Sequence, residues 1–196
     1  MLLGARQFFE RRGAPTPPLP YDAEVEYVSI GAGQICNLGI QPTVETLFKV
    51  RAAFVNTNGN LHFGIKKGEY ASFRIFYYAS NLFFDLGNYN GQGGRCQVSS
   101  LSLNTVYDME FGNNYVKVGG VEVASKTTST TTLDTGEFQF GPGASKVYSA
   151  QLSTGGVMQR DIIPVRLDTA GYFYDRVSGE MFGASTGSLT PGPDKS

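Results

Sequence analysis

The feature that most constrains this chain is a two-residue alternation of apolar and polar side chains that recurs from Tyr21 onward. It is clearest in the segment 47–54, LFKVRAAF, where apolar residues take every second position and Lys49 and Arg51 lie between them. Successive side chains of a β-strand point to opposite faces, so the pattern predicts strands with one buried and one solvent-facing side. We count about a dozen such segments and expect no helix after residue 20.

Glycine-containing turns separate the expected strands. The pair Gly119-Gly120 stands between 116–118 and 121–123, which predicts a two-residue hairpin turn because primed turns need positive φ. The segment 175–179, DRVSG, predicts another turn, since Asp and Ser side chains bond to turn backbone and glycine adopts positive φ freely. Many short strands joined by such turns predict an all-β fold, a two-sheet antiparallel sandwich or jelly roll.

Length and proline placement divide the chain into an arm and a domain. A chain of 196 residues suits one domain with a sizeable core. Four of the nine prolines fall in 14–20, APTPPLP, and their fixed φ favours a semi-rigid polyproline II spacer. We therefore expect an N-terminal arm with a Pro-rich linker over 1–20 and a single β-sandwich domain over 21–196.

The arm mixes basic side chains with large apolar ones, namely Leu2, Leu3, Phe8 and Phe9. An isolated helix of this length is marginal in water. Two interpretations therefore stay open, a frayed tail and a peptide that orders against a partner or a sister subunit. The phenylalanines favour docking, so we expect the arm to contact other proteins of an assembly.

Charge and cysteine content exclude several classes of protein. The net charge is −1 and no basic segment follows the first dozen residues, which argues against a nucleic-acid partner. No apolar run approaches the roughly 20 residues of a membrane span. The N-terminus lacks the pattern of a secretory signal, which predicts synthesis in the cytoplasm. Cys36 and Cys96 could pair, but two reduced core cysteines are the preferred interpretation.

The sequence gives little support for catalysis. The single histidine, His62, is expected at an outward strand position, without a triad neighbour or a second imidazole for zinc. Asp108 and Glu110 are expected to share a strand face, as the paired carboxylates of jelly-roll glycan hydrolases do. Val106 and Gly112 stand where a third carboxylate would be needed. We therefore expect neither enzyme activity nor a cofactor.

The richest candidate for ligand binding is the loop 85–95, DLGNYNGQGGR. The residues that offer hydrogen bonds, charge or a ring for stacking are Asp85, Asn88, Tyr89, Asn90, Gln92 and Arg95. A calcium ion could be held by Asp85, Asn88 and Asn90, but hard cations prefer several carboxylates. A polar hairpin connection without a ligand is the simpler alternative. The chain has no Trp, so stacking on a sugar would fall to Tyr77, Tyr78 and Tyr89.

Two stretches carry a resemblance to a known family. The segment 26–40, EYVSIGAGQICNLGI, is similar to the opening EYIESTGTQYIDTGI, and 160–187, RDIIPVRLDTAGYFYDRVSGEMFGASTG, is similar to the close RDFIPVRKNGVGYMYDKVSGKLFGNAGTG. Both are typical of the concanavalin A-like, laminin-G-like jelly roll found in phage, prophage and gut-bacterial proteins. The similarity spans about residue 21 to the end and is strongest at the two ends.

The resemblance implies two curved antiparallel sheets whose first and last strands lie together. Taken together with the arm and its spacer, the lack of a secretory signal and the lack of a catalytic constellation, this lectin-like fold predicts a non-enzymatic binding or adhesion module. We expect an accessory protein on the surface of a phage or prophage virion that presents the domain to a glycan or cell surface. Asn37 replaces the usual aspartate, so an inherited acidic site is not expected there. A structural subunit without a ligand and a glycan hydrolase remain as alternatives, and a homo-oligomer is compatible with each.

Overall fold

The computed structural model describes residues 18–56, 58–65, 72–87, 94–126, 133 and 135–196. Several residues singled out from the sequence lie outside these ranges: Leu2, Leu3, Phe8 and Phe9 of the arm, and Asn88, Tyr89, Asn90 and Gln92 of the loop. Within the described ranges there are strands, turns and loops and no helix, so no helix there could cross a membrane. The expected all-β class is confirmed.

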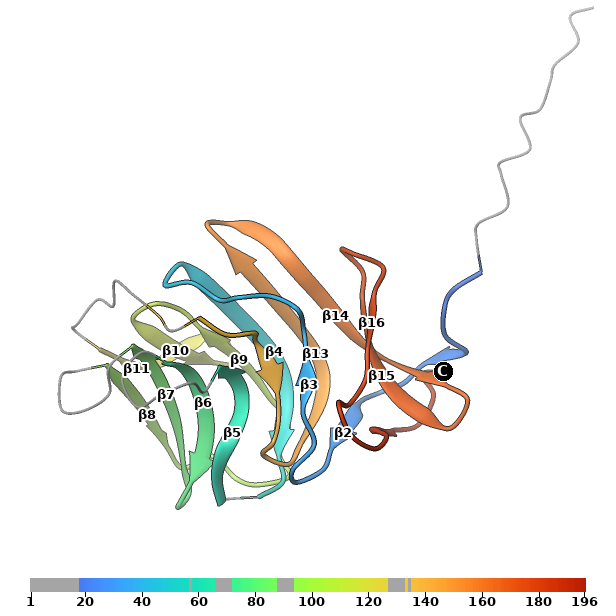
Figure 1. The fold of residues 1–196 in the computed structure, drawn as a ribbon. Coiled ribbons are helices and arrows are strands. Elements are labelled where there is room, and N and C mark those ends of the chain that lie inside the picture. The colour runs from blue at the N-terminus through green and yellow to red at the C-terminus, as the bar shows by residue number, and fades with distance from the viewer. Residues whose placement is uncertain (1–17, 57, 66–71, 88–93, 127–132, 134) are drawn as a thin grey trace, which may run out of the picture.

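The strands of the described residues form two antiparallel sheets (Figure 1). The central path of the eleven-stranded sheet is β11 (Val121–Ser125), β10 (Tyr115–Val118), β9 (Tyr107–Phe111), β4 (Thr46–Phe54), β13 (Ser145–Thr154), β14 (Val157–Leu167), β15 (Ala170–Asp175) and β16 (Met181–Phe182). Three short strands join it, β1 (Ala23–Glu24), β2 (Val28–Ile30) and β17 (Thr190–Pro191). The six-stranded sheet is β3 (Cys36–Asn37), β12 (Gln139–Phe140), β5 (Asn58–Ile65), β6 (Ser72–Tyr78), β7 (Asn81–Gly87) and β8 (Arg95–Ser99).

An aromatic core joins the two sheets. The ring of Phe48 on β4 lies 5.5 Å from that of Phe63 on β5 and 4.8 Å from that of Phe138. The rings of Phe84 on β7 and Phe111 on β9 lie 5.3 Å apart. All five side chains are fully buried, so the inward residues of the two sheets pack face to face, as in a β-sandwich. The sheets do not close into a barrel.

The two ends of the domain lie side by side, as the resemblance implies. β1 pairs with β14, and β17 pairs with β2, both antiparallel. An isolated bridge also joins Val25 to Asp194. The larger sheet extends past the smaller one at this end, where the described N-terminal residues lie next to the C-terminus (Figure 1).

The two expected turns are present. Gly119 and Gly120 have φ of 58° and 81° and connect β10 to β11 as a tight hairpin. Gly179, with φ of 78°, lies in the turn between β15 and β16, where its N–H donates to the carbonyl of Asp175 at 2.8 Å. In both places a side chain would be strained at positive φ, which explains the glycines.

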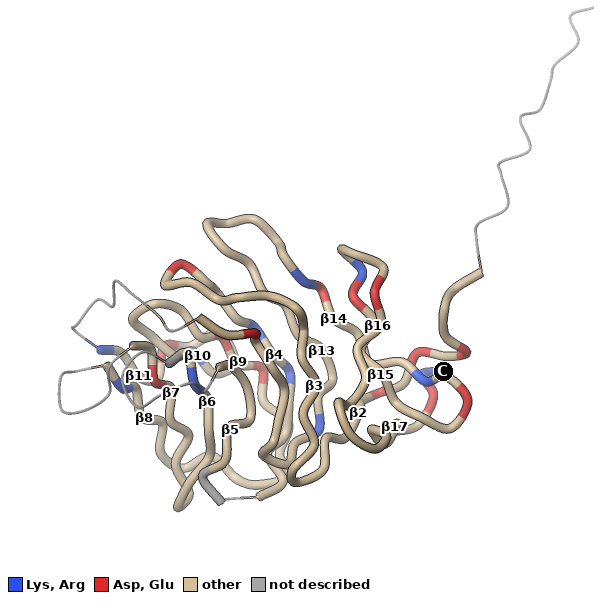
Figure 2. The backbone as a smooth tube through the Cα atoms, viewed as in Figure 1, with Lys and Arg blue, Asp and Glu red and all other residues tan. Residues whose placement is uncertain are grey.

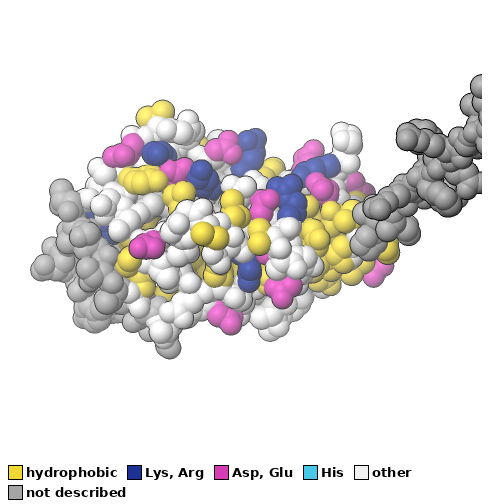
Figure 3. Space-filling model, turned by 90° about the horizontal axis from the view of Figure 1, so that it is seen from above, with side chains coloured by type: hydrophobic (Ala, Val, Ile, Leu, Met, Phe, Trp, Pro, Cys, Tyr) yellow, Lys and Arg dark blue, Asp and Glu magenta, His cyan; other side chains and the backbone are white. Residues whose placement is uncertain are grey.

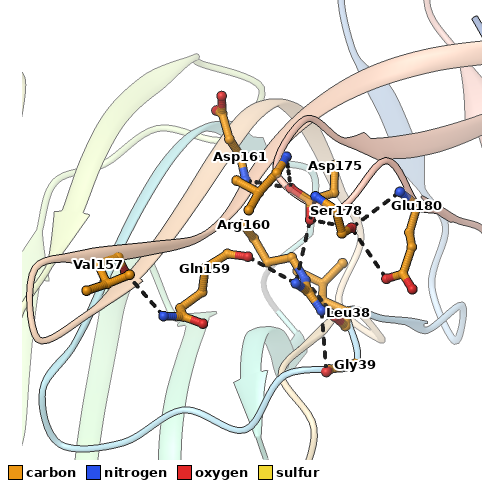
Figure 4. Close-up of polar contacts among 10 residues, drawn as sticks. Leu38, Gly39, Val157, Gln159, Arg160, Asp161, Asp175, Ser178 and Glu180 are labelled. Atoms are coloured by element: carbon orange, nitrogen blue, oxygen red, sulfur yellow. Dashed lines mark hydrogen bonds and ion pairs between the residues drawn. The ribbon is translucent and has the colours of Figure 1, made fainter. Parts of the chain in front are cut away.

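A buried carboxylate organises the C-terminal hairpin (Figure 4). The side chain of Asp175 is fully buried, and its oxygens accept hydrogen bonds from the backbone N–H of Asp161 and Val177 and from the hydroxyl of Ser178 at 2.8, 3.1 and 2.7 Å. Burial alone would raise the pKa of this carboxyl, but the hydrogen bonds outweigh it and hold the pKa of Asp175 below its ordinary value.

Arg160 links this hairpin to the other sheet (Figure 4). Its Nη1 lies 3.6 Å from Oδ2 of Asp175, and its Nε donates to the carbonyl of Leu38 at 3.1 Å. Leu38 follows β3 directly, so one guanidinium connects the turn of the larger sheet with an edge of the smaller one. Arg160 and Asp175 both belong to the stretch 160–187 that is similar to the closing sequence of the resembled family. This stretch therefore includes residues that connect the two sheets.

Two expectations about side-chain direction are wrong. His62 is fully buried, because the register shift between Leu61 and Phe63 breaks the alternation of β5 and leaves His62 on the same inward side as Phe63. Its ring packs 4.9 Å from that of Phe54, and neither ring nitrogen has a hydrogen-bond partner in the described structure. Tyr77 is also buried, and its hydroxyl donates to the carbonyl of Leu101, so Tyr77 is not a platform for a sugar.

The two cysteines are buried and free, as preferred from the sequence. Burial raises the pKa of the Cys36 thiol to about 12 and raises that of Cys96 as well. Both thiols are therefore protonated near neutral pH and act as small apolar core residues.

Candidate binding surface

The described ends of the loop 85–95 form a salt-bridged anchor. The side chain of Asp85 is fully buried, and its oxygens accept from Nε of Arg95 at 2.6 Å and Nη2 of Arg74 at 2.7 Å. Both guanidiniums also lie over the ring of Phe76, at 4.5 Å for Arg74 and 5.4 Å for Arg95.

The surroundings of Asp85 change the role expected from the sequence. Its carboxylate is enclosed by two cations, so it joins β6, β7 and β8 at the base of the loop instead of facing a ligand or a calcium ion. Arg95 is about one-third exposed but shares this pairing. The described residues contain no group of three or more His, Cys, Asp or Glu side chains placed to hold a metal ion.

A row of polar side chains crosses the outer face of the larger sheet. The strand register pairs Lys117 with Glu110, Glu110 with Lys49, Lys49 with Gln151, and Gln151 with Asp161. The row therefore runs over β10, β9, β4, β13 and β14, at right angles to the strands. We call these five residues the polar row, and Figure 2 marks basic and acidic positions on neighbouring strands of this sheet.

Ion pairs and hydrogen bonds hold the polar row in place. Glu110 lies 3.4 Å from Nζ of Lys49 and 3.2 Å from Nζ of Lys117, and it accepts from the hydroxyl of Tyr115 at 2.7 Å. The Tyr115 hydrogen bond, together with the two lysines, outweighs partial burial and lowers the pKa of Glu110. Burial of the ring and, after it, the Glu110 carboxylate raise the pKa of Tyr115 to about 12, so its hydroxyl remains a donor.

The other end of the row is held in the same way. Asp161 accepts from Nε2 of Gln151 at 3.1 Å and from Nε of Arg176, in the turn after β15, at 2.9 Å. A second line of side chains lies two residues along the same strands. There Arg51 pairs with Asp108 at 2.9 Å and lies opposite Ser149 in the register. Basic and acidic groups thus alternate across the face.

A shallow hollow of about 380 Å³ lies over this part of the sheet. Its polar lining residues are Lys49, Arg51, Asp108, Glu110, Ser149, Gln151, Asp161 and Arg176. Three basic side chains therefore face three acidic ones. The space-filling view also shows basic and acidic side chains next to one another, without a large area of one sign (Figure 3).

Asp108 and Glu110 share the outer face of β9, as expected, and both carboxylates are held in ion pairs. A general acid must hold a proton, whereas the Tyr115 hydroxyl and two lysines keep Glu110 ionised. Asp108 is mostly exposed and paired with Arg51. What the arrangement offers is a set of fixed hydrogen-bond donors and acceptors.

The sequence predicts which side chains point outward from β4 and β9, but not which outward residues meet. Gln151, Asp161 and Arg176 were not identified as site residues. They come together because β14 pairs with β13 and β13 pairs with β4, and the register of β13 on β4 joins residues more than 90 positions apart in the chain. Asp161 lies in the stretch 160–187 that is similar to the closing sequence of the resembled family. This similarity was the one indication in the sequence that could have drawn attention to it.

Comparison with known protein families and with curated protein sequences finds no match to this chain. The chemistry of the surface itself is therefore the basis for assigning a function.

Proposed function

We propose that this protein is a non-enzymatic binding module that takes a glycan on the hollow over β9, β4, β13 and β14. The observation that carries the proposal is the alternation of donors and acceptors across this hollow, in which every described charged group has a partner of opposite charge. A sugar hydroxyl both donates and accepts, so it suits a surface that interleaves the two. Side chains already held in place lose less entropy when a ligand binds.

The two sheets are, on this proposal, a jelly roll of the concanavalin A-like type. Support comes from the two stretches similar to that family and from the pairing of the first strands with the last. In addition, the inward faces of two antiparallel sheets form one core. The fold by itself does not decide the function, so the proposal depends on the hollow.

The proposed location is the surface of a phage or prophage particle, with the arm as the attachment. Deletion of residues 1–20 should leave thermal unfolding unchanged, because the first strand begins at Ala23. The shortened chain should be absent from purified particles that carry the full chain. If particles incorporate both forms equally, the arm is not the attachment.

A glycan hydrolase is the alternative class, and Glu110 provides its test. The full chain, incubated with neutral and anionic polysaccharides, should release no new reducing ends, and Glu110→Gln should behave in the same way. Cleavage by the full chain that disappears in Glu110→Gln would overturn the non-enzymatic proposal. Asp161→Asn is the matched control, because it neutralises another acid of the same hollow.

Binding itself is tested by retention of the full chain on immobilised polysaccharides. We expect retention on at least one of them, competed by the same polysaccharide in solution. If none retains the protein, the purely structural subunit becomes the better account.

A further inference from the structure

Building on the proposed function, we infer that the ligand is an uncharged, unbranched polysaccharide that lies along the polar row, across the strands, and contacts Ser149 and Gln151 at its centre.

The direction of the ligand follows from the register of the strands. The five residues of the polar row are direct cross-strand partners, so they define a straight path. Neighbouring strands are about 4.8 Å apart, so the path from β10 to β14 is about 19 Å long.

The balance of charge in the hollow indicates that the ligand is uncharged. Among the described residues that line the hollow, Asp108, Glu110 and Asp161 lie 2.7 to 3.4 Å from Arg51, Lys49 and Arg176, so each acid has a basic partner. Glu110 also pairs with Lys117 at the end of the polar row, so this lysine is not free to neutralise an anionic ligand either. An anionic polysaccharide would have to displace Asp108, Glu110 or Asp161 from its partner and would face these carboxylates itself. A chain of uncharged hydroxyl groups avoids both costs.

The centre of the polar row offers polar groups that are able to bind a ligand. Lys49 and Gln151 face each other, but no hydrogen bond joins them in the described structure, and here the alternation of charge is interrupted. Gln151 commits its Nε2 to Asp161, which leaves its carbonyl oxygen able to accept. The hydroxyl of Ser149 on the same strand likewise makes no hydrogen bond within the described residues. These two groups are placed to meet ligand hydroxyls.

Gln151→Leu should weaken binding of a neutral polysaccharide about ten-fold, because it removes the central hydrogen bonds while it keeps the bulk of the side chain. Ser149→Ala removes a single hydroxyl oxygen and should weaken binding of the polysaccharide less than Gln151→Leu does. Gln97→Leu is the matched control, since Gln97 is an exposed glutamine on β8 of the other sheet. Thermal unfolding of each variant establishes that it is folded.

The probes are a β-glucan, a mannan and a galactan as neutral chains, and polygalacturonate and hyaluronate as anionic ones, each tested at low and high ionic strength. Retention on a neutral chain that is insensitive to salt, reduced by Gln151→Leu and unchanged by Gln97→Leu, supports the inference. Salt-sensitive retention on anionic chains alone overturns the inference while the binding function stands. Neutral binding that is unaffected by Gln151→Leu and Ser149→Ala also overturns it, and retention on no chain removes the proposed function as well.

Discussion

Asp175→Ala should lower the free energy of unfolding by about 4 kcal/mol, because it breaks a buried ion pair and leaves the cationic partner behind. Loss of the carboxylate would leave both a charged group and backbone donors without their partner. Arg160 would keep its charge in a largely buried position, and the backbone N–H groups of Asp161 and Val177 would lose their acceptor. Chemical denaturation of the wild type and the variant measures the difference.

Glu180→Gln is the control for this substitution. Glu180 lies in the same turn, but it is exposed, and its side chain makes one long contact with the hydroxyl of Ser178 at 3.4 Å. The change should therefore stay within about 0.5 kcal/mol of the wild type. Equal losses for Asp175→Ala and Glu180→Gln would contradict the structural role given to the Asp175 carboxylate.

Acid should destabilise the protein through its only histidine. Burial lowers the pKa of His62 from 6.5 to about 4, so between these values the unfolded chain binds a proton that the folded protein does not. The contribution of His62 is therefore fully present above pH 6.5 and is lost as the pH falls toward 4. The difference between the two pKa values corresponds to about 3 kcal/mol.

His62→Leu isolates this contribution, because His62 is the only histidine in the sequence. The side chains packed on it include the apolar rings of Phe54 and Phe63. The free energy of unfolding, measured from pH 7 to pH 4, should fall less steeply in the variant than in the wild type. Comparing the two slopes removes any constant change caused by the substitution. Parallel slopes would show that burial of His62 is not what makes the protein acid-sensitive.

Much of the fold follows from local sequence. The alternation of 47–54 and the Gly119-Gly120 turn predict β4 and the hairpin of β10 and β11, because side-chain direction and positive φ are properties of neighbouring residues. The burial of Phe48 and the exposure of Lys49 and Arg51 agree with that pattern. The partnership of the first strands with the last was implied by the resemblance, since no local pattern specifies partners so far apart.

His62 marks the limit of the alternation. A bulge places two successive residues on one side of a strand, so the pattern of polar and apolar residues no longer reports direction. In β5 the bulge between Leu61 and Phe63 is followed directly by Gly64, whose φ is 119° and where a Cβ would clash with the carbonyl oxygen of Phe73. A glycine inside an apolar strand was the available signal.

The candidate site was harder to predict than the fold. A loop rich in Asn, Gly and Arg suggested binding at 85–95, yet its described acid, Asp85, is a buried anchor. The polar row depends on register, and each of its residues looks by itself like an ordinary solvent-facing side chain. Only the alignment of five strands brings Lys49, Gln151 and Asp161 into one line.

The most direct test of the account is a titration of the ¹⁵N-labelled full chain with soluble neutral oligosaccharides of the gluco-, manno- and galacto- series, followed by NMR. We expect chemical-shift changes at the side-chain amide of Gln151 and along the backbone of β9, β4, β13 and β14. Changes confined to the ends of the loop between β7 and β8, or the absence of changes with every oligosaccharide, would contradict a binding surface on the larger sheet.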